Sequence, residues 1–194
     1  MEPLLRMDRI PHIWWAPGRF KAGHVASEIV ETVDVTNSLH DPQQVTKHKQ
    51  SVTAAVRALR QAGASFEDHP YDYVEGGGTA RFAAETRVDE HLVLKTLVME
   101  DEKGQPLIVL MHGDREVSTK NLARHLGVKS VRPCDPAVAD KHSGYFVGGT
   151  SPFGTRRKMP VYAESTIFDL DVIYINAGHR GLMLRMHAAD LDAA

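Results

Sequence analysis

The stretch LVLKTLVM, Leu92–Met99, and the run LIVLM at Leu107–Met111 decide the fold. Both runs are rich in leucine, valine and isoleucine, which pack well on the pleated surface of a sheet. The residues between them are mostly acidic or polar and include Gly104. Two β-prone runs joined by a short link of this kind are typical of a β-hairpin. We therefore predict that the two runs form an antiparallel hairpin.

Lys95 lies inside the first run and has apolar neighbours on both faces of the expected strand. An ammonium group in such surroundings is not expected to be simply solvated. The alternative is a lysine that lays its apolar stem along a strand edge and keeps its charge in water. Lys95 is therefore the first candidate for a functional cation.

Helix and strand signals continue on both sides of the hairpin. Residues Val52–Ala62 have apolar positions at helical spacing, with Ser51 as the expected cap and Gly63 as the stop. The other expected elements are strands at Phe66–Tyr73, Lys129–Arg132, Pro160–Glu164, Val172–Ile175 and Gly181–His187, helices at Thr79–Thr86, from Ser118 or Thr119 to Leu126, after Asp135 and at Ala188–Leu191, and a turn at Asn176–Arg180. Strands dominate without a regular βαβ order, so we predict a single α+β domain with a mixed, curled, barrel-like β-sheet flanked by short helices.

Residues 1–50 differ from the rest of the chain because they show no sustained period, and Trp14 and Trp15 stand there among prolines and glycines. We interpret residues 1–50 as a poorly structured N-terminal extension or as the result of a start site placed too early. The alternative is an arm that docks through the two tryptophans. Residues 51–194 are then the functional domain.

Composition is typical of a soluble globular protein, with 42% hydrophobic and 25% charged residues. No apolar run approaches the roughly 18 residues that span a membrane, and the N-terminus lacks the pattern of a secretion signal. The single cysteine, Cys134, excludes an internal disulfide framework and fits a reducing compartment. We expect a cytoplasmic protein with no membrane partner, in which Cys134 has no catalytic role.

Charge is distributed unevenly along the chain. Residues 61–102 contain ten acidic and three basic residues, whereas residues 120–158 contain eight basic and two acidic residues. One interpretation is an ordinary solvated surface on which the signs happen to be unevenly spread. The other is a cationic face for a phosphate backbone, because such binding depends on the local field rather than on the net charge.

The segment GYFVGGTSPFG, Gly144–Gly154, is rich in glycine and precedes the basic residues Arg156–Lys158. Glycines let a backbone approach a ligand closely and present its N–H groups, and Pro152 restricts the shape of the loop. Main-chain donors beside cations suit an anionic or carbonyl-bearing ligand. The aromatic residues of the segment are expected to anchor it to the sheet rather than to stack on bases: Tyr145, Phe146 and Phe153.

Several common catalytic motifs are absent from the sequence. It contains no GxSxG elbow, no Walker loop and no GxGxxG motif after a strand. Its eleven histidines form no HExxH or HxH pattern, so no metal site is expected. Ser151 is a conceivable nucleophile, but no histidine stands at a recognisable partner position, which favours a hydrogen-bonding role in the loop.

A set of motifs follows in order between Ser51 and Leu191: FEDHPYDY around Tyr71, AAE (Ala83–Glu85), LKTLV (Leu94–Val98), LARHLGVKSVR (Leu122–Arg132), SGYFVGGTSPFG (Ser143–Gly154), PVYAEST (Pro160–Thr166) and YINAGHRGLML (Tyr174–Leu184). Their order resembles the YbaK/EbsC family of aminoacyl-tRNA deacylases, which are related to the editing domain of bacterial prolyl-tRNA synthetases. The GYxVGGxSPFG and GxRGL elements are most similar to the branch that removes cysteine from mischarged tRNA(Pro). Thr79-Ala80 stands where relatives often carry an aromatic-Gly pair.

The resemblance implies an enzyme without metal or cofactor that cleaves the ester between an amino acid and the terminal ribose of tRNA. It places the functional lysine at Lys95, the aromatic residue of the pocket at Tyr71, and the acidic position after the loop at Glu164. The GxxxP loop falls on Gly148–Pro152, so the resemblance implies that the N–H groups of this loop hold the carbonyl oxygen as it becomes an oxyanion. The implied loop donors are Gly148, Gly149, Thr150 and Ser151.

The chemistry that the resemblance implies suggests roles for Lys95 and for the other basic residues. Lys95 is expected to contact the terminal ribose hydroxyl or phosphate. Arg180 either shapes the pocket and holds the glycine loop or stabilises its own turn. Arg156, Arg157 and Lys158 are expected to meet tRNA phosphates, with a plain solvated loop as the alternative.

Three functions stay open at this point. The first is a deacylase of Cys-tRNA(Pro), and also of Cys-tRNA(Cys), in which the thiol of the substrate attacks its own carbonyl in a lyase-like cleavage. The second is a trans-editing hydrolase for Ala-tRNA(Pro) or another small amino acid, in which water attacks. The third is a non-catalytic module that binds tRNA ends or the synthetase. The expected partners are the acceptor end of aminoacyl-tRNA and, for the first function, prolyl-tRNA synthetase.

Overall fold

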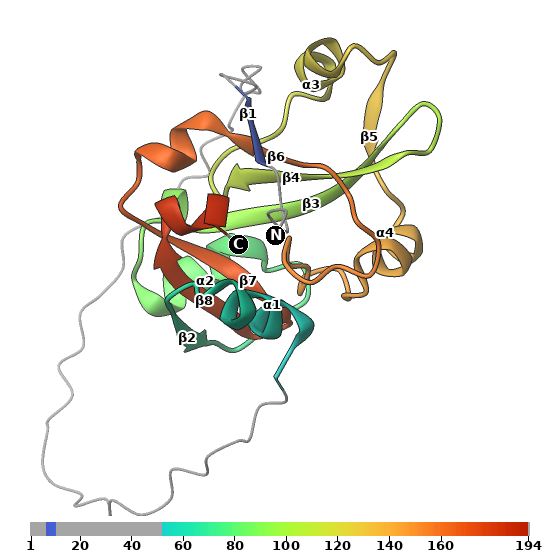
Figure 1. Ribbon diagram of the computed structural model, residues 1–194. Helices are drawn as coiled ribbons and strands as arrows, with labels where there is room; N and C mark the ends of the chain where they lie inside the picture. The colour runs from blue at the N-terminus through green and yellow to red at the C-terminus, as the bar shows by residue number, and fades with distance from the viewer. Residues whose placement is uncertain (1–6, 11–51, 194) are drawn as a thin grey trace, which may run out of the picture. The chain divides into compact units, whose positions relative to one another are not determined.

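The computed structural model of the 194-residue chain describes residues 7–10 and 52–193 (Figure 1). The strands are β1 (Met7–Ile10), β2 (Phe66–Pro70), β3 (Leu94–Asp101), β4 (Pro106–His112), β5 (Val131–Pro133), β6 (Val161–Glu164), β7 (Val172–His179) and β8 (Leu182–His187). The helices are α1 (Ala54–Ala62), α2 (Gly78–Thr86), α3 (Thr119–Leu126) and α4 (Pro136–Ser143), with short 3-10 turns at Glu90–Leu92, Ser165–Asp169 and Ala188–Ala193. In this part of the chain no helix combines the length and the apolar character that crossing a membrane requires.

The strands of the described residues form two sheets. One has the order β1-β6-β4-β3-β5, and the other has the order β2-β8-β7. In the first sheet β6 runs parallel to both β1 and β4, whereas the remaining neighbours of the two sheets are antiparallel. The predicted α+β class is confirmed. The predicted single barrel-like sheet is wrong, because the strands divide between two sheets and neither of them closes on itself over the described residues.

The predicted hairpin is confirmed and forms the centre of the five-stranded sheet. β3 pairs with β4 from Leu94 opposite His112 to Glu100 opposite Pro106. On its other side β3 pairs with β5 only from Met99 onward, and an isolated bridge joins Val93 to Tyr174 of β7. Between that bridge and that ladder, the edge of β3 pairs with no strand of the described residues. The carbonyl oxygen of Val98 accepts from the N–H of Cys134 there, and residues 94–97 line a neighbouring cavity.

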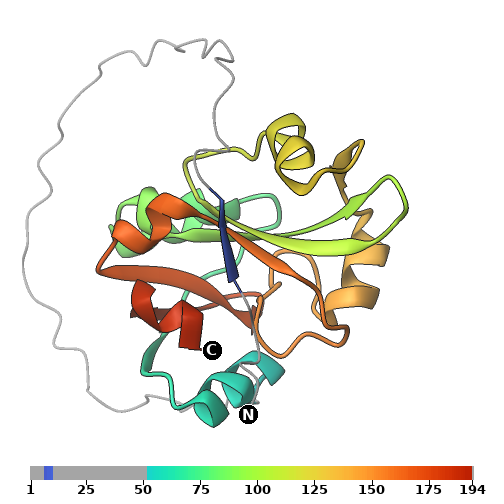
Figure 2. The same cartoon turned by 45° about the horizontal axis from the view of Figure 1, so that its top comes forward.

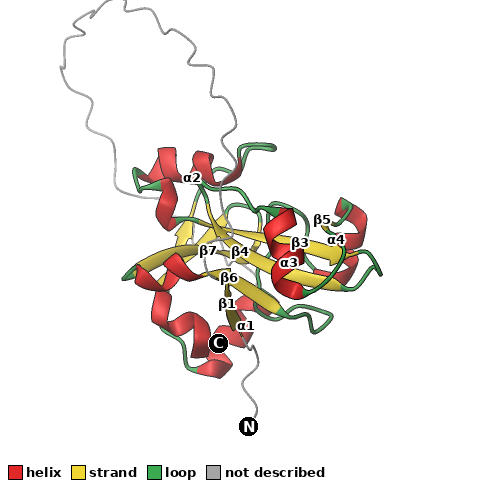
Figure 3. Cartoon of the chain, turned by 90° about the horizontal axis from the view of Figure 1, so that it is seen from above, coloured by secondary structure: helices red, strands yellow, loops and turns green. Residues whose placement is uncertain are grey.

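Helices cover the two faces of the three-stranded sheet, with α1 on one side and α2 on the other (Figure 3). The side chains of β7 alternate accordingly. Ile173, Ile175 and Ala177 belong to the core cluster that includes Ala55, Val56 and Leu59 of α1. Tyr174 belongs to a separate cluster with Phe82 of α2 and Met183 of β8. A third cluster packs Leu122 and Ala123 of α3 on Met99 and Val109 of the hairpin.

The ends of α3 and α1 can be compared with their local sequence signals. Ser118 and Gly127 cap α3 as expected, since the Ser118 side chain accepts a hydrogen bond from the N–H of Asn121 and Gly127 adopts a left-handed conformation. Helix α1 ends at Gly63 but begins later than predicted, because Thr53 rather than Ser51 accepts the capping bond from Val56. Ser51 itself lies outside the described residues.

One further expectation needs correction. β7 continues to His179, so most of the predicted turn at Asn176–Arg180 is strand, with a register shift between Asn176 and His179. The side chain of Asn176 accepts a hydrogen bond from the N–H of Gly178 there, which stabilises the irregularity. Within residues 1–50, Met7–Ile10 forms strand β1 (Figure 2). The rest of that segment, including Trp14 and Trp15, lies outside the described residues.

Candidate active site

A cavity of about 570 Å³ lies beside the open edge of β3. Its wall is formed by the segment from Tyr71 to Phe82, by Leu94–Leu97 of β3, by the glycine-rich loop, and by residues of β7 and β8. Of the residues proposed from the sequence, the structure brings Lys95, Tyr71, Gly148, Thr150 and Arg180 into this lining. A cation and a glycine-rich backbone from distant parts of the chain therefore face the same space.

Lys95 is half-buried and is fixed by its neighbours. Its ammonium group donates a hydrogen bond of 2.9 Å to the carbonyl oxygen of Arg115, in the loop that follows β4. It forms no ion pair with a carboxylate of the described residues. The charge is therefore positioned by a neutral acceptor and not by a carboxylate of the described residues.

The conformation of the glycine-rich loop depends on two glycines. Gly148 has a φ of +88°, and a Cβ atom there would lie 2.8 Å from the hydroxyl oxygen of Tyr73. A Cβ atom on Gly149 would lie 2.8 Å from the backbone nitrogen of Arg180. The loop therefore adopts a shape that only glycine allows at the first position, and packs at the second against the β7–β8 turn more closely than a side chain permits.

The main-chain N–H groups of this loop differ in their partners. The N–H of Gly149 donates to the carbonyl oxygen of Phe146 at 2.8 Å within a tight turn. The N–H groups of Gly148, Thr150 and Ser151 donate no hydrogen bond to any described residue. Gly148 and Thr150 line the cavity, so their donors are the ones best placed for a ligand, whereas Gly149 fixes the turn.

Polar side chains hold the loop from two sides. The Asn176 amide donates to the carbonyl oxygen of Gly148 at 3.2 Å. The Arg180 guanidinium donates twice to the carbonyl oxygen of Val147, at 2.9 and 2.8 Å. Asp140 of α4 accepts from the N–H of Val147 at 2.9 Å. Because these contacts come from β7, from the β7–β8 turn and from α4, the loop is fixed to three separate elements.

The aromatic residues of the loop divide into two groups. Tyr145 and Phe153 are buried, and the Tyr145 hydroxyl donates to the carbonyl oxygen of Phe153 at 2.6 Å. They anchor the loop as predicted. Phe146 is 73% exposed, so the prediction that it anchors the loop is wrong. The guanidinium carbon of Arg180 lies 5.1 Å from the centre of the Tyr73 ring and 5.9 Å from that of Phe146.

The opposite part of the cavity is apolar. Tyr71 and Phe82 meet edge to face with ring centres 5.3 Å apart, and both line the cavity together with Met183. Burial raises the pKa of the Tyr71 phenol above its ordinary value. Tyr71 therefore stays a neutral hydroxyl that can donate or accept a hydrogen bond.

Several residues proposed from the sequence lie outside the lining. Ser151 is fully buried and its hydroxyl accepts a bond from the N–H of Phe153, which does not suit a nucleophile. Glu164 is 1% exposed at the end of β6 and bonds to the Ser165 hydroxyl. Pro152 is also buried. These three residues and Gly149 are absent from the described lining of the cavity.

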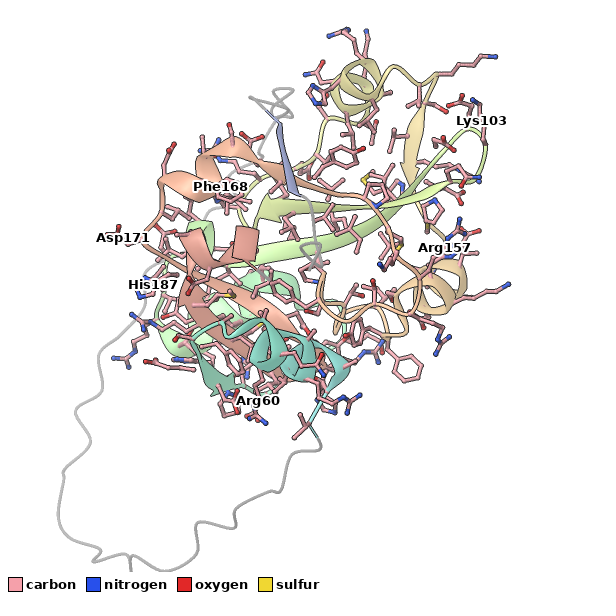
Figure 4. The ribbon with its side chains drawn as sticks, viewed as in Figure 1. Arg60, Lys103, Arg157, Phe168, Asp171 and His187 are labelled. Atoms are coloured by element: carbon pink, nitrogen blue, oxygen red, sulfur yellow. The ribbon has the colours of Figure 1, made fainter. Side chains whose placement is uncertain are left out.

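The basic residues Arg156, Arg157 and Lys158 are exposed, and Arg157 lies beside α4 (Figure 4). The main-chain N–H of Arg157 donates to the carbonyl oxygen of His142, and its side chain donates to Gln105 at 3.4 Å. None of the three lines the cavity over the described residues. They form a separate cationic surface that a ligand extending out of the cavity would have to reach.

Sequence reasoning missed Glu90, which is partly buried and lines the cavity. Its carboxylate accepts a hydrogen bond of 2.7 Å from the hydroxyl of Thr79. It also missed Thr96, whose buried hydroxyl has no hydrogen-bond partner among the described residues. Glu90 stands close to Lys95 in the sequence, but Thr79 and Gly113 reach it only through the fold, so no local signal identifies the arrangement.

Two other titratable groups lie near the site without joining it. His112 is 1% exposed, stacks on His91 with ring centres 3.8 Å apart, and bonds to the hydroxyl of Thr166. Burial lowers the pKa of His112, which favours the neutral ring. Burial likewise raises the pKa of the Cys134 thiol to about 11. A thiol of this kind is a poor nucleophile at neutral pH.

Comparison with known proteins gives a consistent picture. Residues 76–194 match the family model for aminoacyl-tRNA editing domains. A protein of Enterococcus faecalis, provisionally named Cys-tRNA(Pro)/Cys-tRNA(Cys) deacylase EbsC, is 27% identical over 141 residues, which cover 72% of this chain and 86% of the relative. The proline–tRNA ligase of Moorella thermoacetica is 35% identical over 89 residues, which cover 46% of this chain but only 14% of the ligase.

Solved structures show the same fold. The crystal structure of hypothetical protein APE2540 has a TM-score of 0.67 at 19% identity and covers 73% of this chain and 94% of that one. A crystal structure provisionally described as a trans-editing enzyme for prolyl tRNA synthetase has a TM-score of 0.64 at 20% identity, with 72% and 90% coverage. At such identities the likeness establishes the fold and does not extend to substrate.

Proposed function

Since this chain belongs to the family of aminoacyl-tRNA editing domains, we propose that it is a deacylase that cleaves the ester between an amino acid and the terminal ribose of tRNA. The proposed first substrate is Cys-tRNA(Pro), with Cys-tRNA(Cys) as a second. One observation carries the proposal: Lys95, which pairs with no described carboxylate, lines one cavity together with Gly148 and Thr150, whose N–H groups donate to no described residue.

The proposed chemistry needs positioning and charge stabilisation rather than a strong base. An aminoacyl ester is already activated, so the barrier falls when the carbonyl oxygen is held by preorganised donors as it gains negative charge. We assign that task to the N–H groups of Gly148 and Thr150. Lys95 contacts the ribose hydroxyl or the adjoining phosphate and stabilises the leaving alkoxide.

The attacking group in this proposal is the thiol of the substrate's own cysteine. Its sulfur bonds to the carbonyl carbon, the ester C–O bond breaks, and the thiol proton ends on the ribose oxygen, so a cyclic thioester and free tRNA result. The cleavage is then lyase-like. Ser151 is buried and Cys134 does not line the described cavity, which is compatible with a substrate-derived nucleophile. If water attacks instead, the enzyme is an ester hydrolase and alanine esters become substrates.

The proposed route of the tRNA end uses the surfaces around the cavity. Phe146 is exposed beside Arg180, and an aromatic ring next to a guanidinium is a suitable platform for an unstacked base. Arg156, Arg157 and Lys158 would meet phosphates further along the strand. These contacts involve only the acceptor end of the tRNA. The selection of tRNA(Pro) among other tRNAs would therefore come from prolyl-tRNA synthetase, the proposed partner in the cytoplasm.

The test is to incubate the purified protein with Cys-tRNA(Pro), Ala-tRNA(Pro) and Pro-tRNA(Pro) in EDTA and to follow loss of the amino acid. We expect cysteine to be removed fastest and proline to remain. Faster removal of alanine would refute the thiol mechanism and favour a hydrolase. Removal of none of the three, with binding retained, would favour a non-catalytic module.

Lys95→Ala separates an enzyme from a binding module. We expect turnover to fall by about a hundredfold or more, because an interaction made in the transition state is lost. Circular dichroism and thermal unfolding should show a retained fold. Full activity in this variant would remove Lys95 from the mechanism.

A further inference from the structure

The cavity contains two carboxylates among its described lining residues, Glu75 and Glu90, and they differ in their surroundings. Glu75 is exposed at the rim, whereas Glu90 is partly buried. Glu90 forms no ion pair with any described residue, Lys95 included. A partly buried carboxylate without a cationic partner loses part of its hydration, and among the described residues only a neutral donor compensates for it.

Neutral groups fix the position of the Glu90 carboxylate. One of its oxygens accepts the Thr79 hydroxyl at 2.7 Å, and the same hydroxyl lies 3.4 Å from the carbonyl oxygen of Gly113. A Cβ atom on Gly113 would lie 2.8 Å from Cγ of Glu90, so the absence of a side chain at Gly113 makes room for this arrangement. The carboxylate is therefore held in one place, with capacity to accept further hydrogen bonds.

The charges of the cavity match those of an aminoacyl ester. Such an ester carries an α-ammonium group on one side of its carbonyl and the phosphate of the terminal nucleotide on the other. The cavity offers the Glu90 carboxylate, the Lys95 ammonium and the loop N–H groups without pairing the two charges to each other. The other cation of the described lining, Arg180, already donates to Val147 and holds the loop.

We propose that Glu90 binds the α-ammonium of the aminoacyl group, and that it thereby limits the substrates to esters with a free amino group. This inference rests on the proposed deacylase function and specifies its substrate class. A peptidyl-tRNA or an N-formylated aminoacyl-tRNA has no α-ammonium, so it would leave the carboxylate desolvated and unpaired. Glu90 is thus a specificity residue that protects acylated amines from cleavage.

The test compares a tRNA(Pro) minihelix carrying amide-linked cysteine with the same molecule N-acetylated, because the amide linkage resists cleavage and reports binding alone. Wild-type protein should bind the free amine about tenfold more tightly, as expected for one charge-assisted contact. Glu90→Gln keeps the size of the side chain and an acceptor for Thr79, and should abolish this preference. The matched control Glu75→Gln, at the exposed carboxylate, should retain it.

Turnover of the corresponding esters separates this inference from the proposed function. A preference for the free amine that Glu90→Gln abolishes supports the inference even if no ester is cleaved, in which case the deacylase proposal fails alone. Cleavage without preference for the free amine overturns the inference and leaves deacylation standing. A preference that survives in Glu90→Gln, or that disappears equally in Glu75→Gln, also overturns it.

Discussion

Gly149→Ala gives the sharpest test of the loop geometry. A Cβ atom at this position would lie 2.8 Å from the backbone nitrogen of Arg180 and 3.1 Å from the carbonyl carbon of His179. Both contacts are with main-chain atoms of the β7–β8 turn, so no side chain can rotate to make room. The loop itself must move, and the N–H groups of Gly148 and Thr150 move with it.

The expected effect on activity is larger than the effect on stability. Overpacking of this kind costs about 1–3 kcal/mol, which for a chain of this length lowers the melting temperature by roughly 2–12 °C. Displacing the proposed oxyanion donors should lower kcat by about 10²–10³-fold. The assay is single-turnover deacylation of Cys-tRNA(Pro) at a temperature well below the melting point of the variant.

Gly104→Ala is the matched control. Gly104 has a φ of +71° in the hairpin loop, and a Cβ atom there meets no heavy atom within 4 Å. It should therefore cost about 1 kcal/mol of backbone strain and leave kcat unchanged. If Gly149→Ala lowers the melting temperature while kcat stays near the wild-type value, the loop does not supply the oxyanion donors. An equal loss of kcat in Gly104→Ala would refute the reasoning as well.

Three further predictions concern other surfaces of the domain. Replacing Arg156, Arg157 and Lys158 together by glutamine should weaken tRNA binding and reduce the slope of log K against log salt by about 2–3; an unchanged slope in filter-binding titrations would place the phosphate contacts elsewhere. Phe146→Ala should raise KM for the aminoacyl-tRNA by about tenfold through loss of base stacking, with little change in melting temperature because the ring is 73% exposed. Cys134→Ser should keep full activity in the deacylation assay. Because burial raises the pKa of the Cys134 thiol to about 11, iodoacetamide at pH 8 should modify the native protein far more slowly than the urea-unfolded chain. Rapid inactivation of the native protein by iodoacetamide would contradict the prediction that Cys134 is unreactive.

The parts of the fold that follow from local signals could be predicted from the sequence. The β3–β4 hairpin depends on two apolar runs and a short polar link, and α3 depends on Ser118 and Gly127 at its ends. Both signals lie within a few residues of the structure that they specify. The division into two sheets depends instead on which strands pair across the chain, as in the parallel pairing of β6 with β4, and strand periodicity does not encode that choice.

The residues of the candidate site likewise divide into those that a local sequence signal identifies and those that only the tertiary structure brings together. Lys95 and Gly148 could be identified because each stands out from its neighbours, one as a charge in an apolar run and the other in a glycine cluster. Phe146 was assigned wrongly because an aromatic residue in such a loop fits core packing and exposure equally well. Glu90 was missed because its significance comes from Thr79 on α2 and Gly113 after β4, which only the tertiary structure brings to it.

The Glu90 carboxylate and the Lys95 ammonium are both positioned by one short segment, and this relation favours a binding role over a structural one. Gly113 packs against Glu90, and the carbonyl oxygen of Arg115, two residues further on, accepts from Lys95. A structural role for the two side chains would be to pair with each other, although such a pair adds little net stability. Over the described residues they do not pair. Preorganised charges that are held apart by neutral groups interact most strongly with a ligand that brings both opposite charges. An aminoacylated tRNA end is such a ligand, whereas the deacylated end lacks the ammonium and should dissociate more readily.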